Sequence, residues 1–261
     1  MQKGFIFDLD GTVYLEDQLI EGAAETIELL ESRGDKVVFL TNKSIETIES
    51  YVKKLKRLGI NTKRENIINS NLLVARYLKK RLKDDDKIMV IGEQPLLDEI
   101  NSYGIRVSNK YKEIKTVVLG WDRDFTYDKL NVAFQAWLNG AEIIATNPDR
   151  TCPVEDNGQV PDCGAMIGAL EGATGQKISG ILGKPSKLAA KYIVEDILKL
   201  PKSDCFMVGD RLETDIKMGI NYGMKTILVL TGISNREMVL NSKYTPDYTL
   251  DSIKDLMRLE L

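Results

Sequence analysis

The stretch GFIFDLDGTVY, Gly4–Tyr14, decides the fold, because an apolar run ends in two aspartates, Asp8 and Asp10, with glycine and threonine directly after them. The run GFIF is typical of a strand that is buried on both faces. Two carboxylates at the end of such a strand repel each other unless a cation compensates their charge. The stretch therefore raises the question of what the two acids do there.

Other short apolar runs alternate with amphipathic segments along the chain. The runs are KVVFLTN (36–42), KIMVIG (87–92), TVVLGW (116–121), EIIATN (142–147), GILG (180–183), CFMVGD (205–210) and KTILVL (225–230). Helices are expected over 23–34, ending at Gly34, and over 44–59, with Ser44 as N-cap and Gly59 as the stop. This alternation predicts an α/β fold in which helices flank a parallel sheet.

Polar residues follow the strands in two groups, one before about Ser70 and one after about Gly183. Between the groups, three apolar runs form a βα series of their own. This indicates a small α/β domain inserted into a larger one. We expect a core domain over 1–76 and 180–261 and an inserted domain over 77–179.

Composition narrows the classes of function. The 261 residues carry a net charge of −3 and no basic block, which argues against a nucleic-acid partner. No apolar run approaches the roughly 20 residues of a membrane span, and the chain enters a strand too early for a signal peptide. Its three cysteines form no CxxC pair and are expected to be reduced thiols of a cytoplasmic protein. The absence of histidine excludes Ser-His-Asp and Cys-His catalysis and histidine-ligated zinc sites.

Four strand ends are expected to meet, because sites in open parallel sheets form at the carboxyl ends of strands. Besides the first strand, they carry Thr41 and Asn42, then Lys184, and then Asp210 with Asp215 a short turn further on. Each motif alone also fits a helix cap, a turn or a solvated side chain. Taken together and in this order, the four are hard to explain as caps.

The chemistry of this set is coherent. Oxygen ligands without histidine or thiolate favour Mg²⁺, which Asp8 and Asp210 would coordinate together with the backbone carbonyl of Asp10. The Thr41 hydroxyl, nearby amides and Lys184 would hold phosphate oxygens. Asp8 would then attack phosphorus while Asp10 handles the proton, giving an aspartyl-phosphate that water hydrolyses.

At this point the chain resembles the haloacid dehalogenase (HAD) superfamily, in its NagD-like, p-nitrophenylphosphatase-type branch. The resemblance covers essentially the whole chain and rests on the four motifs together with GWDRDFTYDKL (120–130), ATNPD (145–149), GALEGATG (168–175) and GKPS (183–186). It implies a Rossmann-like core that carries out catalysis. It also implies an inserted cap of the C2 type, which selects the substrate.

The resemblance also implies roles for individual residues. Asp8 is the nucleophile and Asp10 the general acid and base, while Lys184 steadies Asp8 and the phosphoryl group. Asp210 is a Mg²⁺ ligand. Asp215 supports the metal, and the same resemblance leaves open whether it does so directly or through water.

Further residues are implied to contact phosphate or substrate. Thr41 and Asn42 contact the phosphoryl group, and Gly11 and Thr12 begin a flap after the first strand. Lys43 departs from the TNN sequence that is common in this branch. It is either an extra cation beside the phosphate or cap entrance, or a solvated lysine at a helix start.

The leading hypothesis is a Mg²⁺-dependent phosphomonoesterase. Asn147 and Asp149 are candidates for selecting the leaving group, although Asn-Pro-Asp also fits a plain turn. Two alternatives remain open: a phosphotransferase or mutase of the same superfamily, and a non-catalytic protein that binds a phosphorylated ligand. Nucleotide monophosphates, sugar phosphates, phosphoglycolate and pyridoxal phosphate all fit as substrates, and the family allows a homodimer through the cap.

Overall fold

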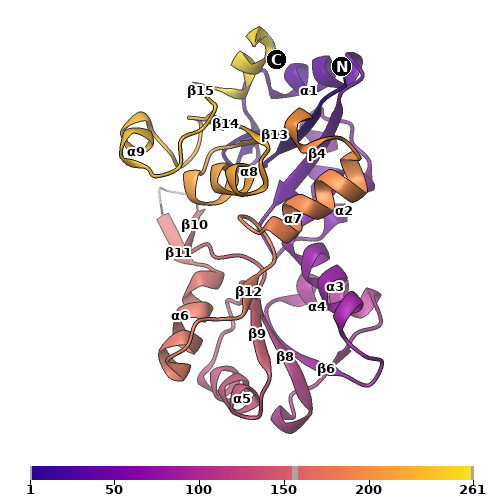
Figure 1. Cartoon of the computed structure of the whole chain (residues 1–261), viewed down its shortest axis with the longest axis vertical. Coiled ribbons are helices and arrows are strands. Elements are labelled where there is room, and N and C mark those ends of the chain that lie inside the picture. The colour runs from indigo at the N-terminus through magenta and orange to yellow at the C-terminus, as the bar shows by residue number, and fades with distance from the viewer. Residues whose placement is uncertain (1, 155–157, 260–261) are drawn as a thin grey trace. The chain divides into compact units, whose positions relative to one another are not determined.

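The computed structural model describes residues 2–154 and 158–259, and its contacts divide the chain into two compact units (Figure 1). The first, which we call the core unit, comprises Met1–Thr41, Ile48–Ile68 and Lys184–Leu261. The second, the inserted unit, comprises Asn42–Thr47 and Asn69–Gly183. Each unit is built on its own parallel sheet, which confirms the predicted α/β fold.

The core unit contains a six-stranded sheet with the order β15-β14-β13-β1-β4-β5. The strands are β1 (Gly4–Phe7), β4 (Lys36–Thr41), β5 (Ile67–Asn69), β13 (Cys205–Gly209), β14 (Lys225–Val229) and β15 (Tyr248–Leu250). Strand β1 is central and pairs in parallel with both β4 and β13. All four of its residues are buried, as its apolar sequence requires. This arrangement brings the carboxyl ends of β13, β1 and β4 to neighbouring positions.

Helices and short turns connect these strands. They are α1 (Ala23–Ser32), α2 (Ile48–Arg57), α7 (Lys187–Lys191), α8 (Lys217–Tyr222) and α9 (Arg236–Asn241), with the π-helical turns η3 (Tyr192–Leu198) and η5 (Leu212–Ile216) and the 3₁₀ turn η6 (Ile253–Arg258). The hairpin β2 (Tyr14–Leu15) and β3 (Gln18–Leu19) follows β1. Gly34 and Gly59 both have positive φ angles just beyond the ends of α1 and α2, as predicted for helix stops.

The predicted start of the second helix was wrong. Helix α2 begins at Ile48, four positions after Ser44. The Ser44 hydroxyl accepts a hydrogen bond from the backbone N–H of Trp121 at 3.1 Å, and the Ser44 carbonyl accepts one from Asn71 at 2.9 Å. These contacts within the inserted unit hold Ser44 away from the helix, so a partner distant in sequence overrides the local capping signal.

The inserted unit has a five-stranded sheet with the order β12-β9-β8-β6-β7. The strands are β6 (Lys87–Ile91), β7 (Arg106–Val107), β8 (Ile114–Leu119), β9 (Glu142–Ala145) and β12 (Gly180–Ile181); the helices are α3 (Ser70–Arg81), α4 (Gln94–Ser102), α5 (Tyr127–Leu138) and α6 (Cys163–Thr174). Strands β10 (Thr151–Val154) and β11 (Gly158–Pro161) form a separate hairpin. Side chains from β6, β8 and β9 and from α5 and α6 share one hydrophobic cluster.

The chain passes between the two units at Thr41/Asn42, Thr47/Ile48, Ile68/Asn69 and Gly183/Lys184. The expected bounds of the inserted domain were residues 77 and 179, and they remain a prediction. Helix α3 runs without a break from Ser70 to Arg81, and Asn69 caps it by accepting from Leu72 N at 3.0 Å. At the other end, β12 pairs with β9 and so belongs to the inserted sheet, although we had assigned GILG to the core. The catalytic and substrate-selecting roles of the two units remain predictions.

The described residues bear on two further expectations, one about membrane spans and one about the cysteines. None of the helices that they form is long and apolar enough to cross a membrane. Cys152, Cys163 and Cys205 are buried and form no disulfide with one another, as expected for thiols outside a disulfide framework. Burial raises the pKa of Cys163 to about 12, which disfavours the thiolate that a nucleophile requires.

Candidate active site

Asp8, Thr41 and Asp210 lie at the carboxyl edge of the core sheet. Asp8 directly follows β1, Asp210 directly follows β13, and Thr41 is the last residue of β4. Since β13, β1 and β4 are adjacent, the sheet itself places these three side chains next to one another. All three are buried, with exposed fractions of 7% for Asp8, 3% for Thr41 and 1% for Asp210.

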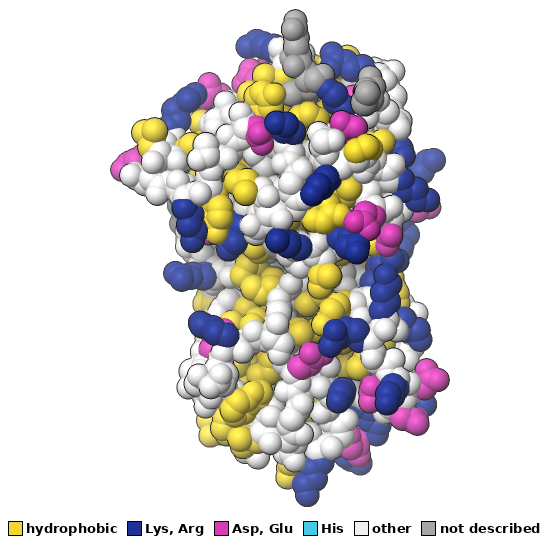
Figure 2. Space-filling model, in the orientation of Figure 1, with side chains coloured by type: hydrophobic (Ala, Val, Ile, Leu, Met, Phe, Trp, Pro, Cys, Tyr) yellow, Lys and Arg dark blue, Asp and Glu magenta, His cyan; other side chains and the backbone are white. Residues whose placement is uncertain are grey.

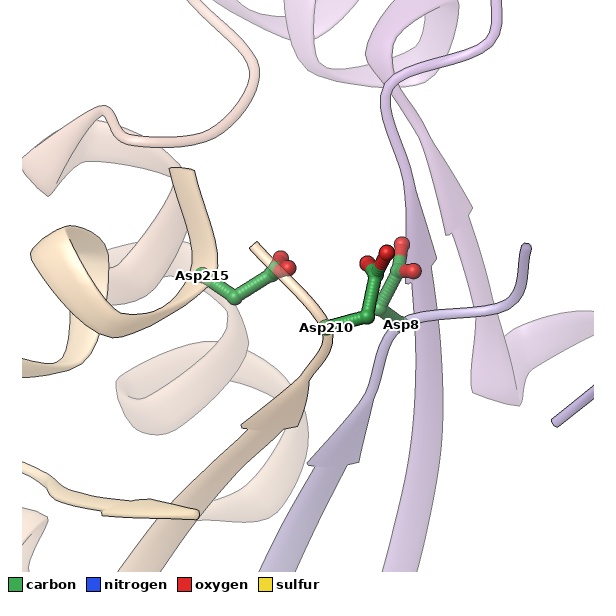
Figure 3. Close-up of side chains that lie close together, drawn as sticks. All are labelled: Asp8, Asp210 and Asp215. Carbon is green, nitrogen blue, oxygen red and sulfur yellow. The ribbon is translucent and has the colours of Figure 1, made fainter. Parts of the chain in front are cut away.

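Three carboxylates converge at this edge. Asp8, Asp210 and Asp215 each offer an oxygen, and these oxygens all lie within 4.8 Å of one another. Figure 3 shows the carboxylates of Asp8 and Asp210 at the ends of two neighbouring strands, with Asp215 pointing toward them from a helical turn. Asp215 fits there because residue 209 is glycine: a Cβ at that position would lie 2.3 Å from the Asp215 Cγ.

Lys184 joins two of these acids. Its Nζ bonds to Asp8 Oδ1 and lies 2.7 Å from Asp215 Oδ1. Burial by itself would lower the pKa of Lys184, but the Asp215 and Asp8 carboxylates raise it above its usual value. The lysine is therefore a permanent cation in a site from which water is largely excluded, since its own exposed fraction is 3%.

One lysine does not compensate three buried carboxylates. Burial raises the pKa of Asp8 well above its usual value; Lys184 opposes this rise, while Asp215 and Asp210 add to it. Burial, followed by Asp215, raises the pKa of Asp210 to about 6. Without a further positive charge, this site disfavours the fully ionised state.

The residues fit a hard divalent cation. Asp210 Oδ2 accepts from Ile233 N at 2.7 Å, whereas Asp210 Oδ1 is buried and has no hydrogen-bond partner among the described residues. A buried carboxylate oxygen without a donor is costly unless a ligand occupies its open side. The donors are all oxygens, which is the set that Mg²⁺ prefers. Asp8 and Asp210 are therefore the side chains that would hold the metal, since both oxygens of Asp215 are engaged, Oδ1 by Lys184 and Oδ2 by Arg211 N.

The loop after β1 is tightly folded. The carbonyl of Leu9 accepts from the backbone N–H groups of Thr12, Val13 and Tyr14, and Gly11 N donates to the Tyr14 carbonyl. Gly11 has φ +85°, a left-handed conformation that favours glycine.

Two side chains of the same loop were predicted to contribute to the site. Asp10 is half-buried and lies 3.5 Å from the Tyr14 hydroxyl. The Thr12 hydroxyl is buried and has no hydrogen-bond partner among the described residues. The hairpin of β2 and β3 follows where we expected a flap.

The sequence matches the family model for haloacid dehalogenase-like hydrolases over residues 5–106 and a HAD-hydrolase-like model over residues 181–256. It is 44% identical to a protein named sugar-phosphatase AraL from Bacillus subtilis, over 98% of this chain and 92% of that protein.

Solved structures agree with this match. A 4-nitrophenylphosphatase from Thermotoga maritima has a TM-score of 0.92 at 35% identity, covering 100% of this chain and 98% of that one. A glycerol phosphate phosphatase from Mycobacterium tuberculosis, solved with magnesium, has a TM-score of 0.89 at 26% identity, covering 98% and 76%.

The chain belongs to the haloacid dehalogenase-like hydrolases. This confirms the predicted superfamily and its NagD-like, p-nitrophenylphosphatase-type branch. The carboxyl edge of the core sheet is thus the candidate active site of a HAD hydrolase.

The remaining predicted residues of this HAD hydrolase lie in the inserted unit. Asn42 Nδ2 donates to Asp149 Oδ2 at 2.9 Å, and the Asn42 carbonyl accepts from Asn147 Nδ2 at 2.8 Å and from Ser70 Oγ at 2.7 Å. The structure thus brings Asn42, Asn147 and Asp149 together. Lys43 is half-buried, and because α2 begins only at Ile48, Lys43 does not lie at the helix start.

Sequence reasoning missed one segment of the HAD site, Thr231–Ser234. It follows β14 and supplies Ile233 N, the donor to Asp210 Oδ2. Its sequence signal is the end of the apolar run KTILVL, which is followed directly by Thr231. The rule already applied to the other strands, that polar residues at carboxyl ends form the site, would have found it.

Proposed function

We propose that this HAD hydrolase is a Mg²⁺-dependent phosphatase that cleaves small phosphorylated metabolites, with sugar phosphates as the first candidates. The observation that carries the proposal is the contact of Lys184 with Asp8, in the same site as Asp210 Oδ1, which has no hydrogen-bond partner among the described residues. The names of the relatives support the same class, since they are a sugar phosphatase, a 4-nitrophenylphosphatase and a glycerol phosphate phosphatase.

In the proposed reaction, the Asp8 carboxylate attacks phosphorus and displaces the alcohol. Lys184 fixes the orientation of Asp8 through Oδ1 and offers positive charge to the phosphoryl oxygens. The Thr41 hydroxyl would bind a further phosphoryl oxygen. Asp10 donates a proton to the leaving alkoxide and then takes one from the water that hydrolyses the aspartyl-phosphate.

Asp8, Asp210 and the carbonyl of Asp10 would hold the metal, with Asp215 supporting it. When bound, Mg²⁺ supplies the charge that lets the neighbouring carboxylates ionise together and that polarises the phosphoryl group. A direct role fits Asp210, whose Oδ1 has no hydrogen-bond partner within residues 2–154 and 158–259. Support from outside the metal's ligands fits Asp215, which binds Lys184 and accepts from Arg211 N at 3.0 Å.

The test is a phosphate-release screen on a panel of phosphorylated metabolites, run with Mg²⁺ and with EDTA and ranked by kcat/KM. Hydrolysis that requires Mg²⁺ is expected, with a sugar phosphate among the best substrates. Added sugar acceptors should not divert phosphate from water, as they would for a phosphotransferase. A flat response across the panel would overturn the proposal.

The proton-transfer role of Asp10 leads to a prediction that depends on the leaving group. In Asp10→Asn, kcat/KM for an alkyl phosphate such as glycerol phosphate should fall by at least about 10²-fold, because the departing alkoxide lacks its acid. The parameter kcat/KM reports the steps up to release of the alcohol, so it does not include the later hydrolysis of the aspartyl-phosphate, in which Asp10 acts on both kinds of ester alike. The fall for p-nitrophenyl phosphate should be much smaller, since p-nitrophenolate leaves as an anion. Asparagine retains the backbone carbonyl proposed for the metal, and equal losses on both esters would contradict the acid role.

Asn147 is proposed to recognise the leaving group through one atom. Its Nδ2 is bound to the Asn42 carbonyl, but its Oδ1 is buried without a hydrogen-bond partner among the described residues. That oxygen would accept from a substrate hydroxyl. Asn147→Ala should therefore reduce kcat/KM for polyol phosphates by roughly tenfold or more, relative to p-nitrophenyl phosphate.

Ser70→Ala is the matched control for this prediction, since it removes the other donor to the same Asn42 carbonyl. It should leave the ratio between the two kinds of ester unchanged, whatever it does to the overall rate. If Asn147→Ala and Ser70→Ala affect all esters alike, the Asn147-Pro148-Asp149 segment is a structural turn rather than a selector.

Some expectations about partners stay predictions. Helix α5 exposes Tyr127 and Leu138, and hydrophobic side chains gather over it at the lower left of the face drawn in Figure 2. This is compatible with the homodimer through the inserted unit that the family resemblance implies. Lysine and arginine side chains are scattered over the same face and interspersed with acidic ones. A cytoplasmic location and the lack of nucleic-acid or membrane partners remain predictions.

A further inference from the structure

The segment Thr231–Ser234 forms hydrogen bonds to two parts of the chain that hold proposed metal ligands, the loop after β1 and the residue after β13. The Thr231 hydroxyl donates to the Gly11 carbonyl at 2.6 Å, across 220 residues of sequence. Two residues later, Ile233 N donates to Asp210 Oδ2 at 2.7 Å, and Ser234 N donates to the Asp210 carbonyl at 3.1 Å. One short segment is therefore hydrogen-bonded both to the loop after β1 and to the residue that follows β13.

Close packing shows how tightly this segment encloses Asp210. A Cβ on Gly232 would lie 2.0 Å from Asp210 Oδ2, and a Cβ on Gly11 would lie 2.7 Å from the same oxygen and 3.1 Å from the Gly232 Cα. The carboxylate is thus held between two glycines, where no other residue type fits without displacement. Its remaining oxygen, Oδ1, accepts no hydrogen bond from any residue that the structure describes.

The far end of the segment is also anchored. Ser234 is buried, and its hydroxyl accepts from Leu212 N at 3.3 Å, at the first residue of η5. The same turn carries Asp215. The segment therefore contacts the backbone around Asp210 on both sides, and its freedom to move is small.

We propose that Thr231 is a positioning residue for the metal: its hydroxyl fixes the Gly11 peptide, and thereby the adjoining Asp10 carbonyl, against the carboxylate of Asp210. The Gly11 carbonyl belongs to the peptide unit after the one that carries the Asp10 carbonyl, and the two units are joined at the Gly11 Cα. A fixed Gly11 carbonyl therefore limits the rotation about this atom that would turn the Asp10 carbonyl. Partners outside the ligand set commonly contribute tenfold or more to metal affinity by this kind of orientation. The proposal rests on the proposed function in taking Asp8, Asp210 and the Asp10 carbonyl as the metal ligands.

The test compares Thr231→Val, which keeps the shape and removes the hydroxyl, with Thr231→Ser, which keeps the hydroxyl. Binding of Mg²⁺ to the metal-free full-length protein is measured by isothermal titration calorimetry, with melting temperature as a second readout. Thr231→Val should bind Mg²⁺ roughly tenfold more weakly, while Thr231→Ser should bind it within about threefold of the wild type.

Thr26→Val is the matched control. Thr26 is a buried threonine of the same unit whose hydroxyl also donates to a backbone carbonyl, that of Gly22, at 2.7 Å. It should lower the melting temperature without changing the affinity for Mg²⁺. A purely structural role for Thr231 would give the same pattern in Thr231→Val, and that result would overturn the proposal.

The remaining outcomes are also decisive. If Thr231→Val does not fold, weak Mg²⁺ binding by Thr231→Ser would overturn the proposal, because the serine hydroxyl should suffice. Wild-type affinity in Thr231→Ala, which also lacks the hydroxyl, would overturn it as well. A wild-type protein that binds Mg²⁺ but hydrolyses no phosphate ester would contradict the proposed function while leaving the positioning role of Thr231 intact.

Discussion

Asp8→Asn is expected to reduce phosphate release by at least about 10³-fold, on every ester and at every Mg²⁺ concentration. The amide has the shape of the carboxylate but no nucleophilic oxygen, so the aspartyl-phosphate cannot form. The fold should survive, because Asp8 already lies among acids that disfavour its charge: burial, Asp215 and Asp210 all raise its pKa. Lys184 retains Asp215 as its partner in the variant.

Two measurements separate a lost nucleophile from a damaged site. Borohydride added during turnover reduces an acyl phosphate to an alcohol, so peptide mass spectrometry of the wild type should find homoserine at position 8 and nowhere else. Asp17→Asn serves as the control, since Asp17 is an exposed acid of the core unit that pairs with Arg57. That variant should keep full activity. Retained turnover in Asp8→Asn would rule out the covalent mechanism.

The sequence predicted most of the sheet that carries these residues. The apolar runs that end in Asp8, Asp210 and Thr41 are enough to predict the strands and their polar ends. A strand buried on both faces must be apolar, and the polar residue at its end lies at the edge of the sheet. Parallel pairing of β1 with β4 and β13 then follows from the α/β alternation. The strand-end rule alone does not account for the contact between Lys184 and Asp8, because the strand before Lys184, β12, belongs to the inserted sheet; the family resemblance implied this contact.

Contacts between distant residues explain what the sequence did not predict. Ser44 has a favourable sequence for an N-cap, yet it binds Trp121 N, 77 positions away. Thr231 follows a strand, which predicts its place at the sheet edge, but no neighbouring residue identifies Gly11 as its hydrogen-bond partner. The short strands β7 and β15 have few residues from which a period can be recognised, and one of them, β7, is exposed. In each case, the deciding partner or neighbour lies elsewhere in the chain.

Asp210→Asn should have opposite effects on stability and on metal binding. Burial, followed by Asp215, raises the pKa of Asp210 from 3.8 to about 6, so the folded state binds a proton more tightly than the unfolded state does. The contribution of this group to the free energy of unfolding is fully present below about pH 4 and is lost as the pH rises through about 6. The resulting loss of stability is about 3 kcal/mol at most. Asparagine does not ionise, so the metal-free variant should escape that penalty.

The readout is the difference in melting temperature between Asp210→Asn and the wild type, measured without metal from pH 4 to pH 8. We expect this difference to move in favour of the variant as the pH rises, with most of the change between pH 4 and pH 7. Asparagine also keeps one oxygen for the bond from Ile233 N, so the local packing is retained. A difference that did not depend on pH would contradict the raised pKa.

Asp247→Asn is a control of opposite sign in the same unit. Burial alone would raise the pKa of Asp247, but hydrogen bonds from Thr226 N and Thr226 Oγ1, both 2.8 Å, hold it below its usual value. That variant should lose stability at neutral pH and approach the wild type as the pH falls through the folded pKa of Asp247. The two asparagine variants should therefore diverge as the pH rises, although each removes one carboxylate.

Addition of Mg²⁺ should reverse the order of wild type and Asp210→Asn. The wild type should gain melting temperature with increasing Mg²⁺, because ligand binding stabilises the folded state by mass action. The variant should gain little, because an NH₂ group takes the place of the carboxylate oxygen that has no hydrogen-bond partner in the described part of the chain. Its phosphatase activity should be lost with the metal. Binding of the cation explains why a buried carboxylate would lower the stability of the metal-free protein and yet raise the stability of the Mg²⁺-bound protein. If Mg²⁺ stabilised the wild type and the variant equally, Asp210 would not be a metal ligand.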